Sequence, residues 1–283
     1  MARLEQLELT SRRILAGRNK GDRLSKRKGT SIEFADHRHY VVGDDLRFLD
    51  WNLFARLDRL FIKLFLEEED LSLHLLIDGS TSMNFGTPTK LHLAKQLAAA
   101  LGFIGLINLD RVSVQQLGAG AAGVLPRLRG RTHVPRLMNF LENLRPIGRL
   151  SLRQGVRDFV LRQPARGIAV IISDFLDKDG YEEALRLLVA RRMEVYVIHV
   201  LAPEELAPEV VGDLKLVDAE DGDVAEITAT SYLLKRYKQN LEAFCGSLHQ
   251  FCAQRNMMYV FTSSAAPFER LVLSHLRGRG LLR

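Results

Sequence analysis

An acid and two hydroxyls follow a short apolar segment at alternate positions. Residues 71–77 have the length of a strand, and Asp78, Ser80 and Ser82 come directly after them in an Asp-x-Ser-x-Ser pattern. A loop that leaves the end of a buried strand can turn three such side chains toward one point. Their oxygens suit a hard cation such as Mg²⁺, which prefers oxygen ligands in a near-octahedral shell and keeps some of its waters. The pattern therefore predicts a metal site whose open position could accept a carboxylate from another molecule, and an ordinary Ser/Thr-rich turn is the alternative.

A second strand-like segment ends in the same way. Residues 167–174 form an apolar run that finishes in an acid, Asp174. Continuous apolar runs are typical of strands that are covered on both faces, as in parallel sheets. Ligands of such sheets bind outside the carboxyl ends of the strands, where Asp78 and Asp174 both fall. The two acids are therefore expected to face one site.

Strand-like and helical patterns alternate along the chain. This alternation predicts an α/β fold: a doubly wound, mostly parallel sheet with helices on both faces and right-handed crossovers. Strands are expected at residues 57–66, 71–77, 111–117, 124–128, 167–173, 193–201 and 257–262. Helices are expected at residues 88–110, 134–144, 152–161, 181–191, 233–251 and 267–276. Residues 203–228 interrupt the pattern, and we expect an exposed hairpin there.

The composition is that of a soluble globular protein. Of 283 residues, 47% are hydrophobic and 26% are charged. Cys245 and Cys252 favour a reducing compartment, and their spacing in a helical stretch is too wide for an easy disulfide. No signal peptide is visible, and the most apolar run, residues 97–109, is too short to cross a membrane. We therefore expect a cytoplasmic protein, with residues 1–70 as a basic lead-in and an arm packed on a core of residues 71–283.

Two other patterns each allow two interpretations. Asp36, His37, His39 and Asp44 could bind a metal, but their spacing favours charges that pair with one another. The Gly-x-Gly-x-x-Gly pattern at residues 118–123 follows an expected strand. A dinucleotide site needs a helix after this pattern, and here a second strand follows. We therefore expect a hairpin turn.

The formal net charge of +6 raises nucleic acid or an acidic protein as a partner. The excess of arginine and lysine is concentrated at residues 12–28 and 127–157. Neither region is interleaved with aromatic residues, as a stacking platform for bases would be. A solvated basic face is the simpler interpretation.

Several segments together carry a family resemblance. The chain resembles the bacterial family called domain of unknown function 58, whose core looks like a von Willebrand factor A domain, over about residues 28–283. The segments are Glu33-Phe-Ala-Asp-His-Arg-His-Tyr, Gly43-Asp-Asp-Leu-Arg, Asp50-Trp, Ala55-Arg56, Asp78-Gly-Ser-Thr-Ser82-Met, Asp110-Arg-Val, Leu128-Arg-Gly-Arg-Thr-His, Ser173-Asp174-Phe and Gly212-Asp-Leu-x-Leu-Val-Asp218.

The resemblance implies a metal-ion-dependent adhesion site for Mg²⁺ or Mn²⁺. Asp78, Ser80 and Ser82 would lie in its first loop and Asp174 in its third. Such domains usually offer a threonine in the second loop, which here is residues 148–151. Leu150 cannot ligate a metal, so Ser151 is the candidate in that loop. With two carboxylates we expect weak binding, in the range of about 10⁻⁴ to 10⁻³ M.

The resemblance also implies a function without catalysis. The protein would be a binding module whose metal recruits an acidic residue of a partner, either a MoxR-type AAA+ ATPase or its client, in protein remodelling or activation. A Mg²⁺-dependent phosphoryl-transfer enzyme is one alternative, although a phosphoaspartate mechanism would require an acid two residues after Asp78, where Ser80 stands. A basic nucleic-acid-binding protein is the other, and its binding would depend steeply on salt.

Overall fold

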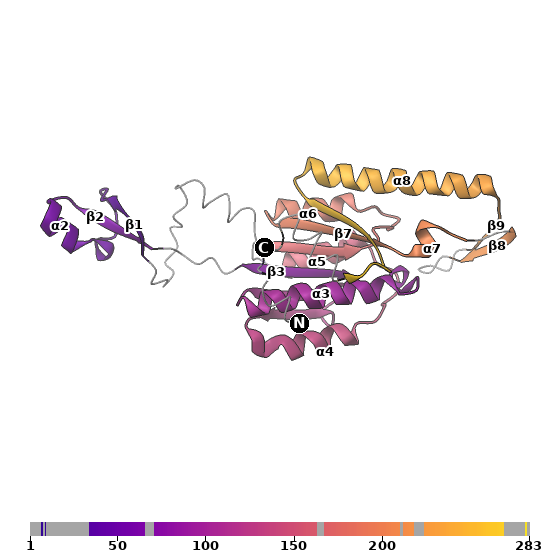
Figure 1. The fold of residues 1–283 in the computed structure, drawn as a ribbon, viewed down its shortest axis with the longest axis horizontal. Coiled ribbons are helices and arrows are strands. Elements are labelled where there is room, and N and C mark those ends of the chain that lie inside the picture. Colours follow the sequence, from indigo (N-terminus) through magenta and orange to yellow (C-terminus); the bar gives the residue numbers. More distant parts are fainter. Residues whose placement is uncertain are drawn as a thin grey trace. The chain divides into compact units, whose positions relative to one another are not determined.

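The computed structural model describes Leu7, Leu9, residues 34–65, 71–162, 167–209, 212–217 and 224–268, and Leu281 (Figure 1). The chain divides into two compact units. The core unit comprises Met1–Arg12 and Leu71–Arg283, and the N-terminal unit comprises Arg13–Asp70.

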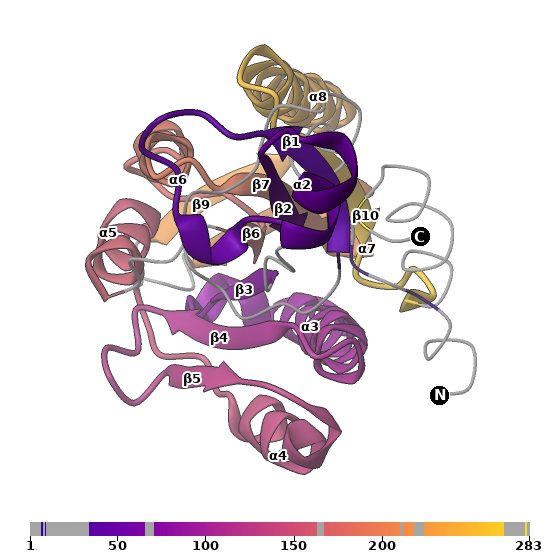
Figure 2. The same ribbon diagram turned by 90° about the vertical axis from the view of Figure 1, so that its left-hand side faces the viewer.

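Among the described residues, the core unit contains a six-stranded sheet in the order β10-β7-β6-β3-β4-β5 (Figure 2). Its strands are β3 (Ser72–Asp78), β4 (Arg111–Leu117), β5 (Val124–Leu128), β6 (Ile168–Ser173), β7 (Glu194–Leu201) and β10 (Met258–Ser263). β5 pairs antiparallel with β4, and the other neighbours pair in parallel. Counted along the chain, this is the doubly wound order 3-2-1-4-5-6. The expected α/β fold is confirmed.

Helices cover both faces of this sheet. Figure 2 shows α3 (Lys90–Ile107) and α4 (Val134–Asn143) on one face, and α5 (Leu152–Arg162) and α6 (Glu182–Ala190) on the other. The longest of the described helices, α8 (Ser231–Gln254), packs beside β10 and α6, where the Arg186 guanidinium lies 5.6 Å from the centre of the Phe251 ring. Every residue of β3 is buried, which explains why this strand reads as a continuous apolar run instead of an alternating one.

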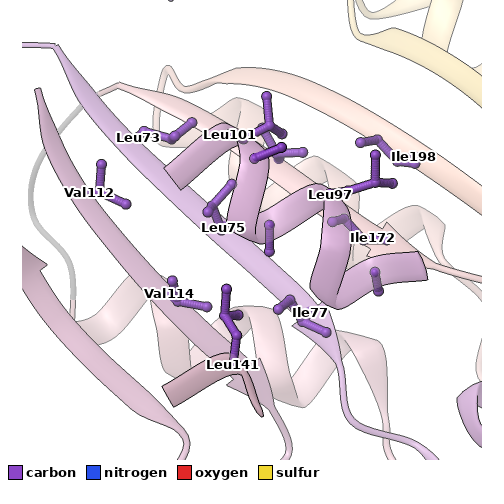
Figure 3. Close-up of a cluster of buried hydrophobic side chains, with 14 of the residues drawn as sticks. Leu73, Leu75, Ile77, Leu97, Leu101, Val112, Val114, Leu141, Ile172 and Ile198 are labelled. Atoms are coloured by element: carbon purple, nitrogen blue, oxygen red, sulfur yellow. The ribbon is translucent and has the colours of Figure 1, made fainter. Parts of the chain in front are cut away.

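The larger hydrophobic cluster lies between the sheet and α3. Alternate residues of a strand point to opposite faces, so one set of β3 side chains faces α3 and the other set faces α5 and α6. Figure 3 shows side chains of α3 and α4 packed against β3, β4, β6 and β7: Leu73, Leu75, Ile77, Leu97, Leu101, Val112, Val114, Leu141, Ile172 and Ile198.

The helix α3 begins two residues later than expected, because Pro88 precedes the helix and Thr89 caps it. The Thr89 Oγ1 accepts a hydrogen bond from the His92 N–H (3.2 Å). Among the described helices, α3 is the one whose length and composition would suffice to cross a membrane, and 72% of it is buried inside the fold. That degree of burial is typical of the core helix of a globular domain.

Replacing Thr89 by alanine is expected to lower the free energy of unfolding by about 1 kcal/mol, because one N–H of the first turn of α3 then loses its acceptor. Urea denaturation measures this change. Thr89→Ser keeps the acceptor oxygen and should remain within roughly 0.5 kcal/mol of the wild type. Equal losses for both variants would show that the cap contributes nothing.

The N-terminal unit combines a hairpin with a short helix. β1 (Phe34–His39) pairs antiparallel with β2 (Phe61–Phe65), and α2 (Trp51–Leu57) lies between them in the sequence. The strand expected at residues 57–66 is therefore wrong in its first four residues, because β2 begins at Phe61. Asp50 caps α2 by accepting hydrogen bonds from two backbone N–H groups, and Asp58 ends the helix in a left-handed conformation.

Charged residues in this unit pair with one another, as one of the two interpretations expected. The Arg38 Nη2 lies 2.6 Å from the Asp44 Oδ1, and the His37 Nε2 lies 2.9 Å from the Asp50 Oδ2. The hydrogen bond with His37 is the main reason why the pKa of Asp50 falls to about 2. The residues that the structure describes contain no group of three His, Cys, Asp or Glu side chains placed for a metal, so the metal interpretation of Asp36, His37, His39 and Asp44 is wrong. The packing of this arm on the core stays a prediction.

The remaining expectations concern turns, thiols and the end of the chain. Residues 118–123 join β4 to β5 as a hairpin turn, and β8 (Gly212–Val217) pairs antiparallel with β9 (Val224–Ala229), both as expected. Both cysteines are free thiols. A four-residue helix that was not expected, α7 (Pro203–Leu206), follows β7. The lead-in and the last expected helix lie almost wholly outside the described residues.

Candidate metal site at the carboxyl edge of the sheet

The two predicted acids leave neighbouring parallel strands at the same edge of the sheet. Asp78 is the last residue of β3, and Asp174 directly follows β6. The two strands pair in parallel, with Ile77 opposite Ile172. They are the first and fourth strands of the doubly wound order, where successive connections run in opposite directions and ligands of such sheets bind. The topology thus brings both acids to the expected place.

Asp78 is buried and bonded on both oxygens. Asp78 is 3% exposed. Its Oδ1 accepts a hydrogen bond from the Ser80 N–H (2.8 Å), and its Oδ2 accepts one from the Ser173 Oγ (2.5 Å). Gly79 permits this tight turn, because a Cβ there would lie 2.6 Å from the Leu117 carbonyl oxygen. The carboxylate is therefore held in one orientation.

The two serines of the first loop point their hydroxyls at each other. The Oγ atoms of Ser80 and Ser82 lie 2.9 Å apart. Two oxygens that occupy adjacent positions of an octahedral magnesium shell lie about 2.8–3.0 Å apart, as follows from bond lengths of about 2.0–2.1 Å. The two hydroxyls are hydrogen-bonded to each other at this distance, and the same spacing is compatible with two adjacent ligands of magnesium.

The loop after β6 places Asp174 through an unusual backbone turn. Phe175 has a φ of 58°, a left-handed conformation that is rare for a bulky residue, and its ring is buried. This turn lets the Phe175 N–H donate to the Ser173 Oγ (2.8 Å) and the Leu176 N–H donate to the Asp174 Oδ1 (3.2 Å). Strained backbone of this kind is concentrated at functional sites.

Sequence reasoning missed a buried lysine at this edge. Lys90, the first residue of α3, is 0% exposed, and its Nζ lies 2.6 Å from the Asp174 Oδ2 and 2.5 Å from the Glu205 Oε1. The sequence contained a signal for this burial. Ala94 and Leu97 lie one and two helical turns after Lys90 on the same face of α3, and both are fully buried. The spacing alone therefore placed Lys90 on the apolar face of α3.

Glu205 reaches the site from α7, which begins where β7 ends. Its Oε2 accepts a hydrogen bond from the Ala202 N–H (2.7 Å), and its carbonyl oxygen accepts one from the Tyr237 hydroxyl (2.8 Å). Both contacts hold the carboxylate toward Lys90. Sequence reasoning had left residues 203–228 as an exposed interruption, so it missed this residue.

The electrostatics of the site favour an additional cation. Burial raises the pKa of Asp78 to about 6, the charge of Asp174 adds to this, and the hydrogen bonds from Ser173 and Ser80 oppose it. Burial lowers the pKa of Lys90, but the charges of Asp174 and Glu205 outweigh it and hold this pKa above its usual value. Asp174 and Glu205 share the ammonium of Lys90, and the charge of Asp174 also acts on a third carboxylate, Asp78. A divalent cation would offset the excess of negative charge. The described residues contain no group of three His, Cys, Asp or Glu side chains placed for a metal, so the serine hydroxyls would have to complete its ligands.

The second loop lies beside the first through backbone contacts. The Thr81 N–H donates to the Gly148 carbonyl (3.0 Å), and the Ile147 N–H donates to the Gly79 carbonyl (2.9 Å). Leu150 is buried in the hydrophobic cluster under α5 and α6. Ser151 is half-buried directly before α5, and its role as a ligand stays a prediction.

The sheet order defines a doubly wound α/β protein, with two acid-ended strands at its switch point. The chain belongs to the family described as Protein of unknown function DUF58, whose model matches residues 36–243. The family expected from the sequence is confirmed.

The chain is similar to an uncharacterized protein of Mycobacterium tuberculosis (strain H37Rv), with 34% identity over 233 residues, 80% of this chain and 73% of that protein. An uncharacterized protein of Mycobacterium bovis gives the same values. Among solved structures, BatB from Bacteroides thetaiotaomicron is 16% identical, covers 74% of this chain and 98% of its own, and has a TM-score of 0.43. The VWA domain of SpRpn10 is 15% identical, covers 72% of this chain and 94% of its own, and has a TM-score of 0.42.

Proposed function

We propose that this protein is a non-enzymatic binding module that uses a weakly bound Mg²⁺ or Mn²⁺ to recruit an acidic residue of a partner protein. Asp78, Ser80 and Ser82 would hold the ion, with Asp174 acting directly or through water, and Ser151 is the candidate from the second loop. The observation that carries the proposal is the pair of serine oxygens 2.9 Å apart beside the buried carboxylate at the switch point. A bound ion supplies an electrophilic position for a carboxylate.

The choice of ligands supports recruitment of an acid. Hydroxyl ligands are neutral, so they leave more of the charge of a divalent ion uncompensated than carboxylates would. Lys90 already faces Asp174, which reduces the negative charge available to the ion further. A carboxylate from outside would complete both the coordination and the charge.

The surroundings of the site support a protein as the partner. Phe85, Ile147 and Leu176 are 48%, 40% and 46% exposed. Each is tied to the site, since the Phe85 carbonyl accepts from the Lys90 N–H, the Ile147 N–H donates to Gly79 and the Leu176 N–H donates to Asp174. Exposed apolar side chains around a polar centre are typical of the surfaces that proteins bury against one another.

The partner that we propose is a MoxR-type AAA+ ATPase or its client, in cytoplasmic protein remodelling or activation. This part rests on membership of the family and on the resemblance of its core to a von Willebrand factor A domain. Phosphoryl transfer is disfavoured because Ser80 stands where an acid would be needed, and its hydroxyl is bonded to Ser82.

The proposal predicts metal-dependent capture of a MoxR-type AAA+ ATPase. The immobilised full-length protein should retain the ATPase in Mg²⁺, release it in EDTA and bind it again when Mg²⁺ is restored. Asp78→Ala should lower recovery by at least about tenfold, which corresponds to the loss of roughly 1.4 kcal/mol or more of binding free energy.

Asp158→Ala is the matched control, because Asp158 is a carboxylate on the surface of α5 that is bonded to Gln154. It should leave recovery unchanged. Circular dichroism melts must show that both variants are folded. Equal recovery with and without EDTA, or equal recovery by the Asp78 variant, would contradict the proposed function.

A further inference from the structure

Lys90 is the most unusual charged group of the core unit. Lysine is almost never fully buried unless it is paired, and Lys90 is 0% exposed. Its two partners come from far along the chain: Asp174 follows β6, and Glu205 lies in α7. The lysine therefore joins the start of α3 to the ends of two neighbouring strands, at the edge where the candidate metal site lies.

The ammonium occupies one of the two carboxylate oxygens of Asp174. The Asp174 Oδ2 accepts from Lys90 (2.6 Å), and the Oδ1 accepts from the Leu176 N–H (3.2 Å). Both oxygens are thus engaged. A cation held by the first loop would have to share Asp174 with Lys90 or take it from Lys90.

Glu205 offers the ammonium a second carboxylate. It lies 2.5 Å from the Lys90 Nζ, and its other oxygen is fixed by the Ala202 N–H. Lys90 can therefore lose its contact with Asp174 and remain paired inside the protein. Without this second partner, the exchange would leave an unpaired buried charge, which is strongly unfavourable.

We propose, resting on the metal site of the proposed function, that Lys90 is a tethered cation that competes with the divalent metal for Asp174, with Glu205 holding the ammonium after the exchange. Binding of the metal then has to separate an existing ion pair. This keeps the affinity for the metal low while Lys90 is present. The exchange also connects the site to α7 and, through the Tyr237 hydroxyl on the Glu205 carbonyl, to α8.

The affinity for Mn²⁺ tests this competition. Binding of Mn²⁺ to the full-length protein is followed by the electron paramagnetic resonance signal of the free ion. Lys90→Met should bind Mn²⁺ at least about tenfold more tightly than the wild type, since a positive charge close to the ion is removed and Asp174 is released. Lys95→Met is the matched control on the same helix. The Lys95 Nζ donates to the backbone carbonyls of Leu144 (2.7 Å) and Glu142 (3.2 Å), so this variant should bind Mn²⁺ like the wild type.

A double-variant cycle separates competition for Asp174 from a simple effect of charge. In the Asp174→Asn background, Lys90→Met should change the affinity for Mn²⁺ by less than about threefold if the lysine acts through Asp174. A gain that persists in this background would overturn the proposal, and so would wild-type affinity in the Lys90→Met variant.

Thermal melts provide a second readout that does not depend on affinity measurements. Mn²⁺ should raise the Tm of Lys90→Met more than that of the wild type, because tighter binding to the folded state stabilises it more.

Different results would contradict the metal site and the competition by Lys90. If the wild type binds Mn²⁺ and Lys90→Met binds it no more tightly, only the competition fails. If neither protein binds Mn²⁺, or Asp78→Ala binds it as well as the wild type, the metal site fails and the competition with it.

Discussion

Lys90→Met is expected to lower the free energy of unfolding of the metal-free protein by about 3–5 kcal/mol, the usual effect of removing one partner of a buried ion pair. Asp174 is 2% exposed and would lose its ammonium, as would Glu205. Methionine fills most of the volume of the lysine stem, so the loss measures charge more than packing. Urea denaturation in EDTA at neutral pH gives the value.

The double variant Lys90→Met/Asp174→Asn shows whether the charge is responsible. Removing both members of the pair leaves one fewer uncompensated carboxylate, so the double variant should be more stable than Lys90→Met alone. Lys95→Met should change stability little, since its ammonium contacts backbone carbonyls at the rim of the fold. A loss below about 1 kcal/mol for Lys90→Met would mean that solvent reaches the carboxylates and compensates them.

Asp78→Asn is expected to stabilise the metal-free protein by about 3 kcal/mol at pH 7–8. The pKa of Asp78 is raised from 3.8 to about 6, chiefly by burial and by the charge of Asp174. A shift of this size corresponds to roughly 3 kcal/mol against the folded state when the group is ionised. This figure already includes the hydrogen bonds from Ser173 and Ser80, which favour the ionised form.

The sign of the pH dependence follows from the raised pKa. Below pH 3.8, Asp78 is protonated in both the folded and the unfolded state and contributes nothing. Between 3.8 and about 6, the unfolded state releases its proton while the folded state keeps it, so stability falls as the pH rises. Above about 6 the penalty is constant. The difference between Asp78→Asn and the wild type should therefore appear over this range and be absent near pH 4.

Urea denaturation in EDTA across pH 4–8 measures the effect, and Asp158→Asn serves as the control on an accessible carboxylate. If the wild type is more stable than Asp78→Asn at pH 8 without metal, the ionised carboxylate is not a burden on the fold. Added Mg²⁺ should narrow the gap, because only the wild type can gain stability by binding it. A carboxylate that destabilises the empty fold is typical of a residue kept for binding.

The sequence alone was sufficient for the central architecture. The apolar runs that became β3 and β6 are local patterns, and a strand covered on both faces must read that way. Because the carboxyl ends of neighbouring parallel strands meet at one edge of the sheet, these runs also place Asp78 and Asp174 at that edge. The helix α3 and the hairpin of β8 and β9 could also be predicted from the sequence, because hydrophobic periodicity and turn residues are local patterns of the chain.

Local competition between side chains and backbone accounts for the error in the N-terminal unit. The strand expected at residues 57–66 overlaps the last residue of α2, Leu57, and this helix forms because the Asp50 carboxylate satisfies two N–H groups of its first turn. A left-handed Asp58 then ends the helix before β2 begins. Both events depend on one cap and one backbone angle, which an apolar pattern does not record.

Only the tertiary structure revealed that the edge of the sheet with the candidate metal site contains the buried ammonium of Lys90. Lys90 and Glu205 are separated by 115 positions in the chain, and Lys90 and Asp174 by 84. No local pattern links such residues, because their pairing follows from the packing of α3 against the sheet and from the turn into α7. Periodicity could place Lys90 on a buried face, but which carboxylates neutralise it depends on where distant strands end. The sequence by itself determined the sheet and the two acids at its edge, and the packing of the chain decided how their charge is balanced.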